Sequence, residues 1–163
     1  MDQQKLRLMF TGGGSGGPTT PLLGLAETLK DHEEYSMEFL FLGTNRGPER
    51  RMVEEFGMPY QAIPAGKLRR YWDWKNLSDP FLVLAGFFHG IYYLLKFRPQ
   101  IVISAGSFTS VPVAWASMIL RVPHLILQMD VRPGLANRLM KPCSNAAVFY
   151  FESTLNTFKG VQK

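Results

Sequence analysis

The amino-acid sequence predicts an α/β fold in which a parallel sheet of about six or seven strands carries helices on both faces. Short apolar runs alternate with longer amphipathic segments along the 163 residues, and each parallel strand pairing needs such a crossover. Prolines stand at the starts of several amphipathic segments, where a first-turn proline costs no hydrogen bond. A run of glycines follows the first apolar run, at the edge of the sheet where parallel α/β folds collect ligands.

Each element is bounded by the period of its apolar residues and by punctuation residues. Strands are expected at 6–10, 37–42, 60–63, 101–104, 124–127 and 146–151. Helices are expected at 20–30, 48–56, 80–97, 109–120 and 133–140. Pro48, Pro80 and Pro133 open three of these helices, and Gly57 can cap the end of one. The longest irregular region, 64–79, is long enough to suggest a function.

Length and composition indicate one domain in a reducing compartment. With 46% hydrophobic residues, the chain can bury one sizeable core but is too short for two full domains, so 1–163 is expected to be a single domain. The single cysteine, Cys143, cannot form an intramolecular disulfide, and the first residues show no secretory signal pattern. These features predict a cytoplasmic location.

The net charge of +5 favours an anionic partner, which could be nucleic acid, an acidic lipid surface or a phosphorylated substrate. The cationic residues gather next to tryptophans, just before the most apolar stretch of the chain. This arrangement indicates an anionic membrane surface and not nucleic acid. The cluster comprises Lys67, Arg69, Arg70, Trp72, Trp74 and Lys75.

The segment 81–97 is apolar on more than one face. It is shorter than the ~20 residues that span a bilayer, so an interfacial helix is the stronger interpretation. The alternative is a helix that packs on the sheet with an unusually aromatic surface, and we expect one face on the core and one on lipid. The side chains expected to enter the membrane are Phe81, Leu84, Phe87, Phe88 and Ile91.

Small residues between the first strand and the first helix predict a diphosphate site. They let the backbone approach a ligand, and the helix that follows presents unpaired N–H groups. The spacing also fits a dinucleotide fingerprint, but no carboxylate follows the second strand to bind a ribose. A P-loop is disfavoured because Pro18 stands where that motif has its phosphate-binding lysine. A tight turn that binds nothing remains the alternative. The proposed binding residues are Gly13, Gly14, Ser15, Gly16 and Gly17.

Two further polar loops follow the fourth and fifth strands, and they would flank the same crevice. In the first, Thr109 or Ser110 can cap the next helix and leave nearby N–H groups free for an anion. The second carries polar residues directly after a buried strand, although a solvated loop would look the same. The candidates are Gly106, Ser107, Thr109 and Ser110, then Gln128, Asp130, Asn137 and Arg138.

Several motifs in this order and spacing resemble the N-terminal domain of the MurG-type glycosyltransferases. The resemblance covers nearly the whole chain, from about Leu6 to Phe151. No single motif would suffice, but their order makes chance unlikely. The motifs are Gly13 to Gly17 with Pro21, Gly43-Thr44 with Glu49, Gly66 to Arg69, Pro99 to Ile103, Ser107 to Pro112, and Pro133 to Arg138.

This resemblance implies the N-terminal half of a GT-B fold, in which two Rossmann-like domains face each other across a cleft. Such enzymes move N-acetylglucosamine from UDP-GlcNAc to lipid I and yield lipid II for peptidoglycan at the cytoplasmic face of the membrane. The N-terminal domain would hold the lipid-linked sugar diphosphate. The UDP-sugar donor would bind a C-terminal domain that is absent here or a partner chain, and no cofactor or metal is implied.

Two departures from the family pattern bear on catalysis. Pro18 stands where the family has a histidine, and 127–130 differs from the family's His-Glu-Gln-Asn. Inverting transfer needs a base, and the three histidines are expected to be structural, which leaves Asp130 as the best-placed carboxylate. The leading hypothesis is therefore an inverting hexosyltransferase half that needs a C-terminal domain or partner. Its rivals are a noncatalytic subunit that binds polyprenyl-diphosphate sugars and a nucleotide-dependent oxidoreductase.

Overall fold

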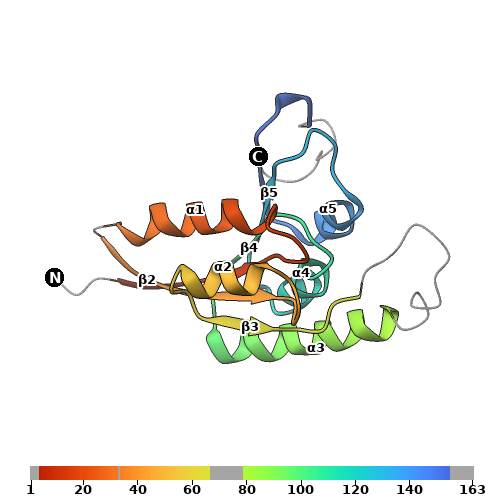
Figure 1. Ribbon diagram of the computed structural model, residues 1–163, viewed down its shortest axis with the longest axis horizontal. Helices are drawn as coiled ribbons and strands as arrows, with labels where there is room; N and C mark the ends of the chain where they lie inside the picture. Colours follow the sequence, from red (N-terminus) through yellow and green to blue (C-terminus); the bar gives the residue numbers. More distant parts are fainter. Residues whose placement is uncertain (1–3, 33, 67–78, 155–163) are drawn as a thin grey trace.

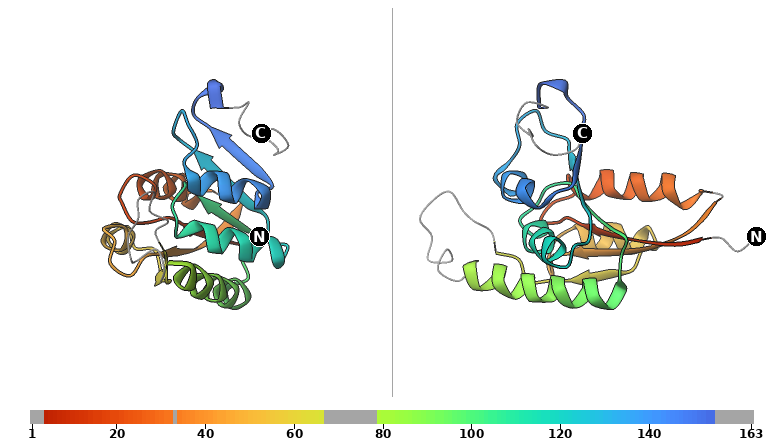
Figure 2. Two further views of the ribbon diagram at one scale, coloured as in Figure 1. Left: turned by 90° about the vertical axis from the view of Figure 1, so that its right-hand side faces the viewer. Right: turned by 180° about the vertical axis from the view of Figure 1, so that it is seen from behind.

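The computed structural model describes residues 4–32, 34–66 and 79–154. They form a six-stranded parallel sheet in the order β3-β2-β1-β4-β5-β6, with helices on both faces (Figures 1 and 2), which confirms the expected architecture. The strands are β1 Gln4–Thr11, β2 Tyr35–Gly43, β3 Tyr60–Ala62, β4 Ile101–Ser104, β5 His124–Gln128 and β6 Ala146–Phe149. The helices are α1 Thr19–Lys30, α2 Glu49–Glu55, α3 Asp79–Phe97, α4 Ser110–Ile119, α5 Leu135–Met140 and the short 3-10 helix η2 Lys141–Cys143.

The strand order creates a crevice beside the central strand β1. The chain moves outward from β1 through β2 to β3 and then returns to place β4 on the other side of β1, where Thr11 lies in register with Ser104. The loops after β1 and β4 consequently leave the sheet toward opposite faces. In open parallel sheets, ligands bind at the carboxyl ends of the strands at this change of direction.

Alternation along the strands divides the core between the two faces of the sheet. Leu8 and Phe10 of β1 join the cluster that α1 and α2 cover, whereas Met9 joins the cluster that α3 and α4 cover. A third cluster joins α4 and α5 to β5 and β6. The two helical layers are separated by the sheet in the left view of Figure 2.

Two element boundaries differ from the sequence prediction for identifiable reasons. The backbone of Gly134 is extended, so α5 begins at Leu135 and Pro133 lies before the helix instead of in its first turn. β6 ends at Phe149 and not at Phe151, because Phe149 pairs with Gln128, the last residue of β5. The other boundaries agree within two residues.

Helix α3 packs closely on α4 through two glycines. A Cβ at Gly86 would lie 3.2 Å from Cγ of Pro112, and one at Gly90 would lie 3.3 Å from Cβ of Ala116. Within the described ranges, α3 is the one helix whose length and apolar composition would allow it to cross a bilayer, and composition alone is weak support for that role. One side of α3 lies against α4 and the core, so the helix is packed on the fold along its length.

Candidate functional site

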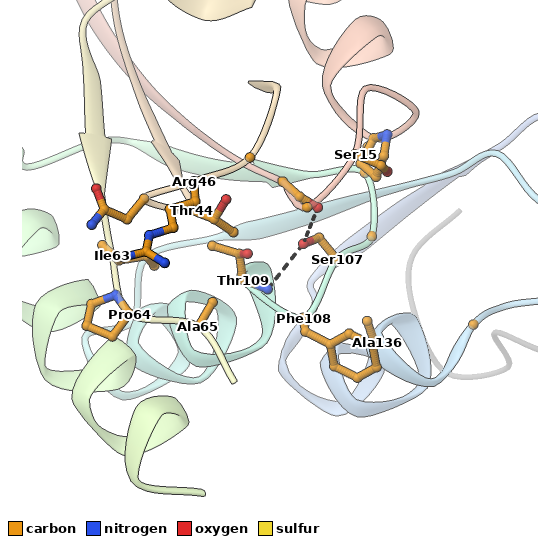
Figure 3. A pocket seen from close by; sticks show the side chains of 18 of the residues that line it. Ser15, Thr44, Arg46, Ile63, Pro64, Ala65, Ser107, Phe108, Thr109 and Ala136 are labelled. Carbon is orange, nitrogen blue, oxygen red and sulfur yellow. Dashed lines mark hydrogen bonds between the residues drawn. The ribbon is translucent and has the colours of Figure 1, made fainter. Parts of the chain in front are cut away.

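A cleft of about 1130 Å³ opens at the carboxyl ends of the strands. Its walls come from the loops that follow β1, β2, β3, β4 and β5, together with the start of α3 (Figure 3). In Figure 3, Ser15 belongs to the loop after β1, Thr44 and Arg46 to the loop after β2, and Ser107 and Thr109 to the loop after β4. The position agrees with the crevice that the strand order creates.

The glycine loop after β1 faces the cleft with its first half only. Gly13, Gly14 and Ser15 line the cleft, and in the described part of the chain their N–H groups donate to no backbone carbonyl. Gly16 instead accepts hydrogen bonds at its carbonyl from Thr19 and Thr20, which begins α1. Gly16 and Gly17, which were also expected to bind the diphosphate, do not line the cleft.

The loop after β4 is tied directly to the glycine loop. The hydroxyl of Ser107 donates to the carbonyl of Gly13 at 3.0 Å and accepts the N–H of Thr109 at 3.1 Å. Thr109 occupies the N-cap position of α4, as expected, but its side chain makes no capping hydrogen bond. Gly106, Ser107 and Thr109 line the cleft. Ser110 does not, because its fully buried hydroxyl donates to the carbonyl of Thr11.

The loop after β2 forms a wall of the cleft that the sequence analysis did not assign to the site. Thr44 makes hydrogen bonds through three of its groups. Its N–H, at 2.9 Å, and its hydroxyl both donate to Oε1 of the fully buried Glu49. The carbonyl of Thr44 accepts the hydroxyl of Tyr60. Burial, followed by the charge of Glu49, raises the pKa of the Tyr60 hydroxyl well above its usual range, so Tyr60 remains a donor. Arg46 follows on the exposed part of the loop and lines the cleft.

The carboxylate of Glu49 also lies directly beneath two glycines of the cleft. A Cβ at Gly13 would lie 2.5 Å from Oε1 of Glu49, and a Cβ at Gly47 would collide with the same carboxylate. Glycine is therefore required at both positions by contact with one buried side chain. Through Glu49, the loops after β1 and β2 share a single anchor.

The loop after β5 is organised by two buried amides. Gln128 donates from Nε2 to the carbonyl of Asp130 at 2.7 Å, and its Oε1 accepts a short hydrogen bond from Nδ2 of Asn137. Asp130 and Asn137 line the cleft, whereas Gln128 supports them from below. Arg138, which was expected near the acceptor or donor, is exposed and does not line the cleft.

No histidine of the described residues lines the cleft. His124 begins β5 and is buried, and its Nε2 contacts the hydroxyl of Ser104 at 2.9 Å and its Nδ1 that of Ser144 at 3.0 Å. Burial lowers the pKa of His124 to about 4, so the imidazole is neutral at pH 7. This agrees with a structural role. In the same ranges, no three His, Cys, Asp or Glu side chains cluster as metal ligands would.

The outer face of α3 exposes a continuous apolar stripe. Phe81 is 72% exposed and Phe88 59%, with Leu84, Tyr92 and Leu95 at helical spacing along the same side. Phe87 and Ile91, which were also expected on the lipid-facing side, are partly buried against the core. The expected headgroup-binding residues Lys67, Arg69, Arg70, Trp72, Trp74 and Lys75 lie outside the described residues.

Comparisons with known proteins agree with this architecture. The N-acetylglucosamine transferases of Clostridium kluyveri and Clostridium novyi that act on N-acetylmuramyl-(pentapeptide) pyrophosphoryl-undecaprenol are 41% and 42% identical over 94% and 95% of this chain. The chain spans 43% of the length of each relative.

Solved structures show the same fold. Acinetobacter baumannii MurG matches with a TM-score of 0.78 at 22% identity, over 98% of this chain and 44% of that one. The UDP-GlcNAc 2-epimerase of Methanocaldococcus jannaschii matches with a TM-score of 0.69 at 15% identity, over 95% of this chain and 42% of the other. The model of the glycosyltransferase family 28 N-terminal domain matches residues 8–148, and the chain therefore belongs to glycosyltransferase family 28.

Proposed function

We propose that this chain is the acceptor-binding half of a glycosyltransferase and that its cleft holds the diphosphate of a lipid-linked sugar. One observation carries the proposal: the hydrogen bond from Ser107 to Gly13 joins two glycine-containing loops that line one cleft. The N–H groups of Gly13, Gly14 and Ser15 are not used by backbone carbonyls of the described residues. Groups of this kind form concave sites that favour phosphate oxygens.

The names of the relatives supply the reaction that we propose. The Clostridium proteins transfer N-acetylglucosamine to a pyrophosphoryl-undecaprenol acceptor, and their names specify UDP-N-acetylglucosamine as the donor. We propose the same transfer here, as a step that yields the lipid II precursor of peptidoglycan. The UDP-sugar would bind a C-terminal domain or a partner chain that faces this cleft.

The proposed transfer inverts the anomeric centre and uses Asp130 as the base. The acceptor hydroxyl attacks the anomeric carbon of the donor sugar, the bond from that carbon to the phosphate oxygen breaks, and Asp130 takes the hydroxyl proton. Asp130 is exposed at the cleft. Its carbonyl accepts the hydrogen bond from Gln128, and the hydroxyl of Thr154 donates to Val131 at 3.0 Å, so the backbone around the carboxylate is fixed.

The stripe on α3 supports a peripheral position on the cytoplasmic face of the membrane. Its aromatic and leucine side chains would enter the acyl boundary while the rest of α3 remains packed on the domain. The start of α3 also lines the cleft through Asp79 and Leu82. A lipid whose diphosphate lies in the cleft would therefore have its hydrocarbon tail close to the membrane.

A second candidate is a noncatalytic subunit that binds polyprenyl-diphosphate sugars for a partner. Pro18, which has no group that can accept a proton, lines the cleft. The acidic side chains among the described lining residues are Asp79 and Asp130. If Asp130 does not act as the base, binding without transfer is the function that the cleft favours.

Lipid binding tests the proposed site directly. The full chain is titrated in detergent with undecaprenyl diphosphate linked to N-acetylmuramyl pentapeptide, with undecaprenyl monophosphate and with undecaprenol. We expect the diphosphate lipid to bind at least about tenfold more tightly than undecaprenol, because charge-assisted hydrogen bonds contribute to the first complex only. Equal affinity for all three lipids would mean that the chain recognises the hydrocarbon tail alone, and the proposed diphosphate site would be wrong.

A further inference from the structure

We infer that Arg46, in the loop after β2, binds the phosphate oxygens of the diphosphate with its guanidinium. The inference rests on the proposed function, because it assigns a residue to the same ligand. It adds a wall of the site that lies across the cleft from the loop after β4. The ligand class is a diphosphate, borne by either the lipid acceptor or a nucleotide.

A cation at this position offsets the acidic side chains among the described lining residues. Among the lining residues that the structure describes, the charged side chains are Arg46, Asp79 and Asp130. A diphosphate would thus meet two carboxylates, and backbone N–H groups carry only partial charges to offset them. Arg46 supplies the full positive charge that the described walls of the cleft offer. Without it, this part of the cleft would repel an anion.

The guanidinium of Arg46 is available for a ligand. Lys5 and Arg7 pair with Glu38, and Arg50 and Arg51 pair with Glu54 and Glu55 on α2. None of the ion pairs within residues 4–32, 34–66 and 79–154 involves Arg46. A guanidinium fork matches two phosphate oxygens at once, which favours a diphosphate over a single carboxylate.

The backbone that carries Arg46 is fixed, although its side chain is exposed. Two residues before it, Thr44 is held by Glu49 and Tyr60 at its N–H, hydroxyl and carbonyl. One residue after it, Gly47 lies against the Glu49 carboxylate. The same carboxylate touches Gly13 of the glycine loop. Glu49 is therefore a positioning residue that sets Arg46 and the glycine loop at a constant separation around the ligand.

The test compares Arg46→Met with Arg51→Met in the full chain. Both changes remove one arginine from the same region, but Arg51 points to solvent from α2 and pairs with Glu55 outside the cleft. The probes are undecaprenyl diphosphate in detergent, UDP and inorganic pyrophosphate, each titrated at several salt concentrations. Urea unfolding of each variant checks that its fold is retained.

We expect Arg46→Met to weaken binding of undecaprenyl diphosphate by at least about tenfold and to flatten its salt dependence, because one charge-assisted contact is lost. Arg46→Lys should recover part of the affinity, and Arg51→Met should bind as the unchanged protein does. A loss seen with UDP but not with the lipid would reassign Arg46 to a nucleotide and overturn the inference for the acceptor.

Two other outcomes separate this inference from the proposed function. If the unchanged chain binds undecaprenyl diphosphate and Arg46→Met binds it equally well, the role of Arg46 is wrong while the diphosphate site stands. If the unchanged chain binds no diphosphate probe, the proposed function itself fails. Equal weakening by Arg46→Met and Arg51→Met would show a general charge effect and would also reject the specific role.

Discussion

Gly13 shows how closely the glycine loop is fitted to the residue beneath it. Its φ of +150° is rarely adopted by residues with side chains, and a Cβ there would lie 2.5 Å from Oε1 of Glu49. Glu49 cannot retreat without losing both of its hydrogen bonds to Thr44. We therefore expect Gly13→Ala to lower the free energy of unfolding by about 2 kcal/mol, measured by urea denaturation.

Gly24 provides the matched control for this substitution. It lies within α1, and a Cβ added there would have no heavy atom within 4 Å. Gly24→Ala should leave the free energy of unfolding unchanged or raise it by up to about 1 kcal/mol, because alanine favours a helix more than glycine does. Similar losses in the two variants would contradict the proposed contact between Gly13 and Glu49.

His124 makes the stability of the domain depend on pH. Its pKa in the folded protein is about 4, well below the ordinary value of 6.5, because burial disfavours the imidazolium. The unfolded chain therefore binds a proton first as the pH falls. The stability that the neutral ring contributes is complete above pH 6.5 and is lost progressively between pH 6.5 and pH 4.

A variant without the imidazole should lose this pH dependence. Between pH 8 and pH 5, we expect the unchanged protein to lose about 2 kcal/mol more of its free energy of unfolding than His124→Gln does. Carboxylates titrate in both proteins, so their contribution to the pH dependence drops out of the difference between them. Urea denaturation at the two pH values provides the measurement, and parallel pH profiles would show that His124 is not buried in its neutral form.

At the scale of single elements, α3 divides its apolar residues between two surfaces. Phe81, Leu84 and Phe88 are exposed, whereas Phe87 lies against the core. We expect Leu84→Ser with Phe88→Ser to reduce binding to anionic liposomes by at least about tenfold in a flotation assay. Each large apolar side chain that enters the acyl region contributes about 1.5–3 kcal/mol when fully buried.

The control for α3 must also remove exposed apolar surface, but at a distance from the helix. Val148 of β6 and Tyr150 after it are both exposed. Val148→Ser with Tyr150→Ser should leave flotation unchanged if the stripe on α3 is the membrane surface. If this control pair reduces flotation as much as the α3 pair does, binding reflects general hydrophobicity and α3 has no special role.

The period of apolar residues predicted the strands and α-helices of the described residues but not the short helix η2, and it could not orient α3. That helix is apolar on most sides, so hydrophobicity alone placed Phe87 and Ile91 in the lipid. The orientation of α3 could have been read from Gly86 and Gly90, which are four residues apart. Small residues mark the side of a helix that approaches another helix closely. The structure places these two glycines against Pro112 and Ala116 of α4.

The sequence also does not show which polar groups are used within the fold, and this explains the differences at the site. The small-residue loops after β1 and β4 line one cleft, but the hydroxyl of Ser110 donates to the backbone of β1, and the carbonyl of Gly16 accepts the first N–H groups of α1. A sequence does not show whether a hydroxyl or carbonyl is used within the fold or offered to a ligand. Arg46 could have been found, because it follows β2 at the same edge of the sheet as the glycine loop.

At the scale of the whole molecule, the transfer that we propose needs an acceptor in the cleft and a donor sugar held by a second domain or a partner chain. The loops that line the cleft follow strands of one sheet, and the chain spans 43% of the length of its Clostridium relatives. The proposed attack also requires a donor sugar held opposite Asp130. We therefore expect transfer only where a donor-binding domain faces the cleft.

A fusion of this chain to the C-terminal domain of the Clostridium kluyveri relative would test catalysis. We expect the fusion to transfer N-acetylglucosamine to the lipid-linked acceptor and this chain alone to transfer none, because the fusion alone has a donor site facing the cleft. Within the fusion, Asp130→Asn should lower the transfer rate by at least about a hundredfold without weakening acceptor binding, since an amide cannot take the proton and carries no charge to repel the diphosphate. A fusion that binds the lipid but transfers no sugar would favour the noncatalytic subunit, and full activity of Asp130→Asn would assign the base elsewhere.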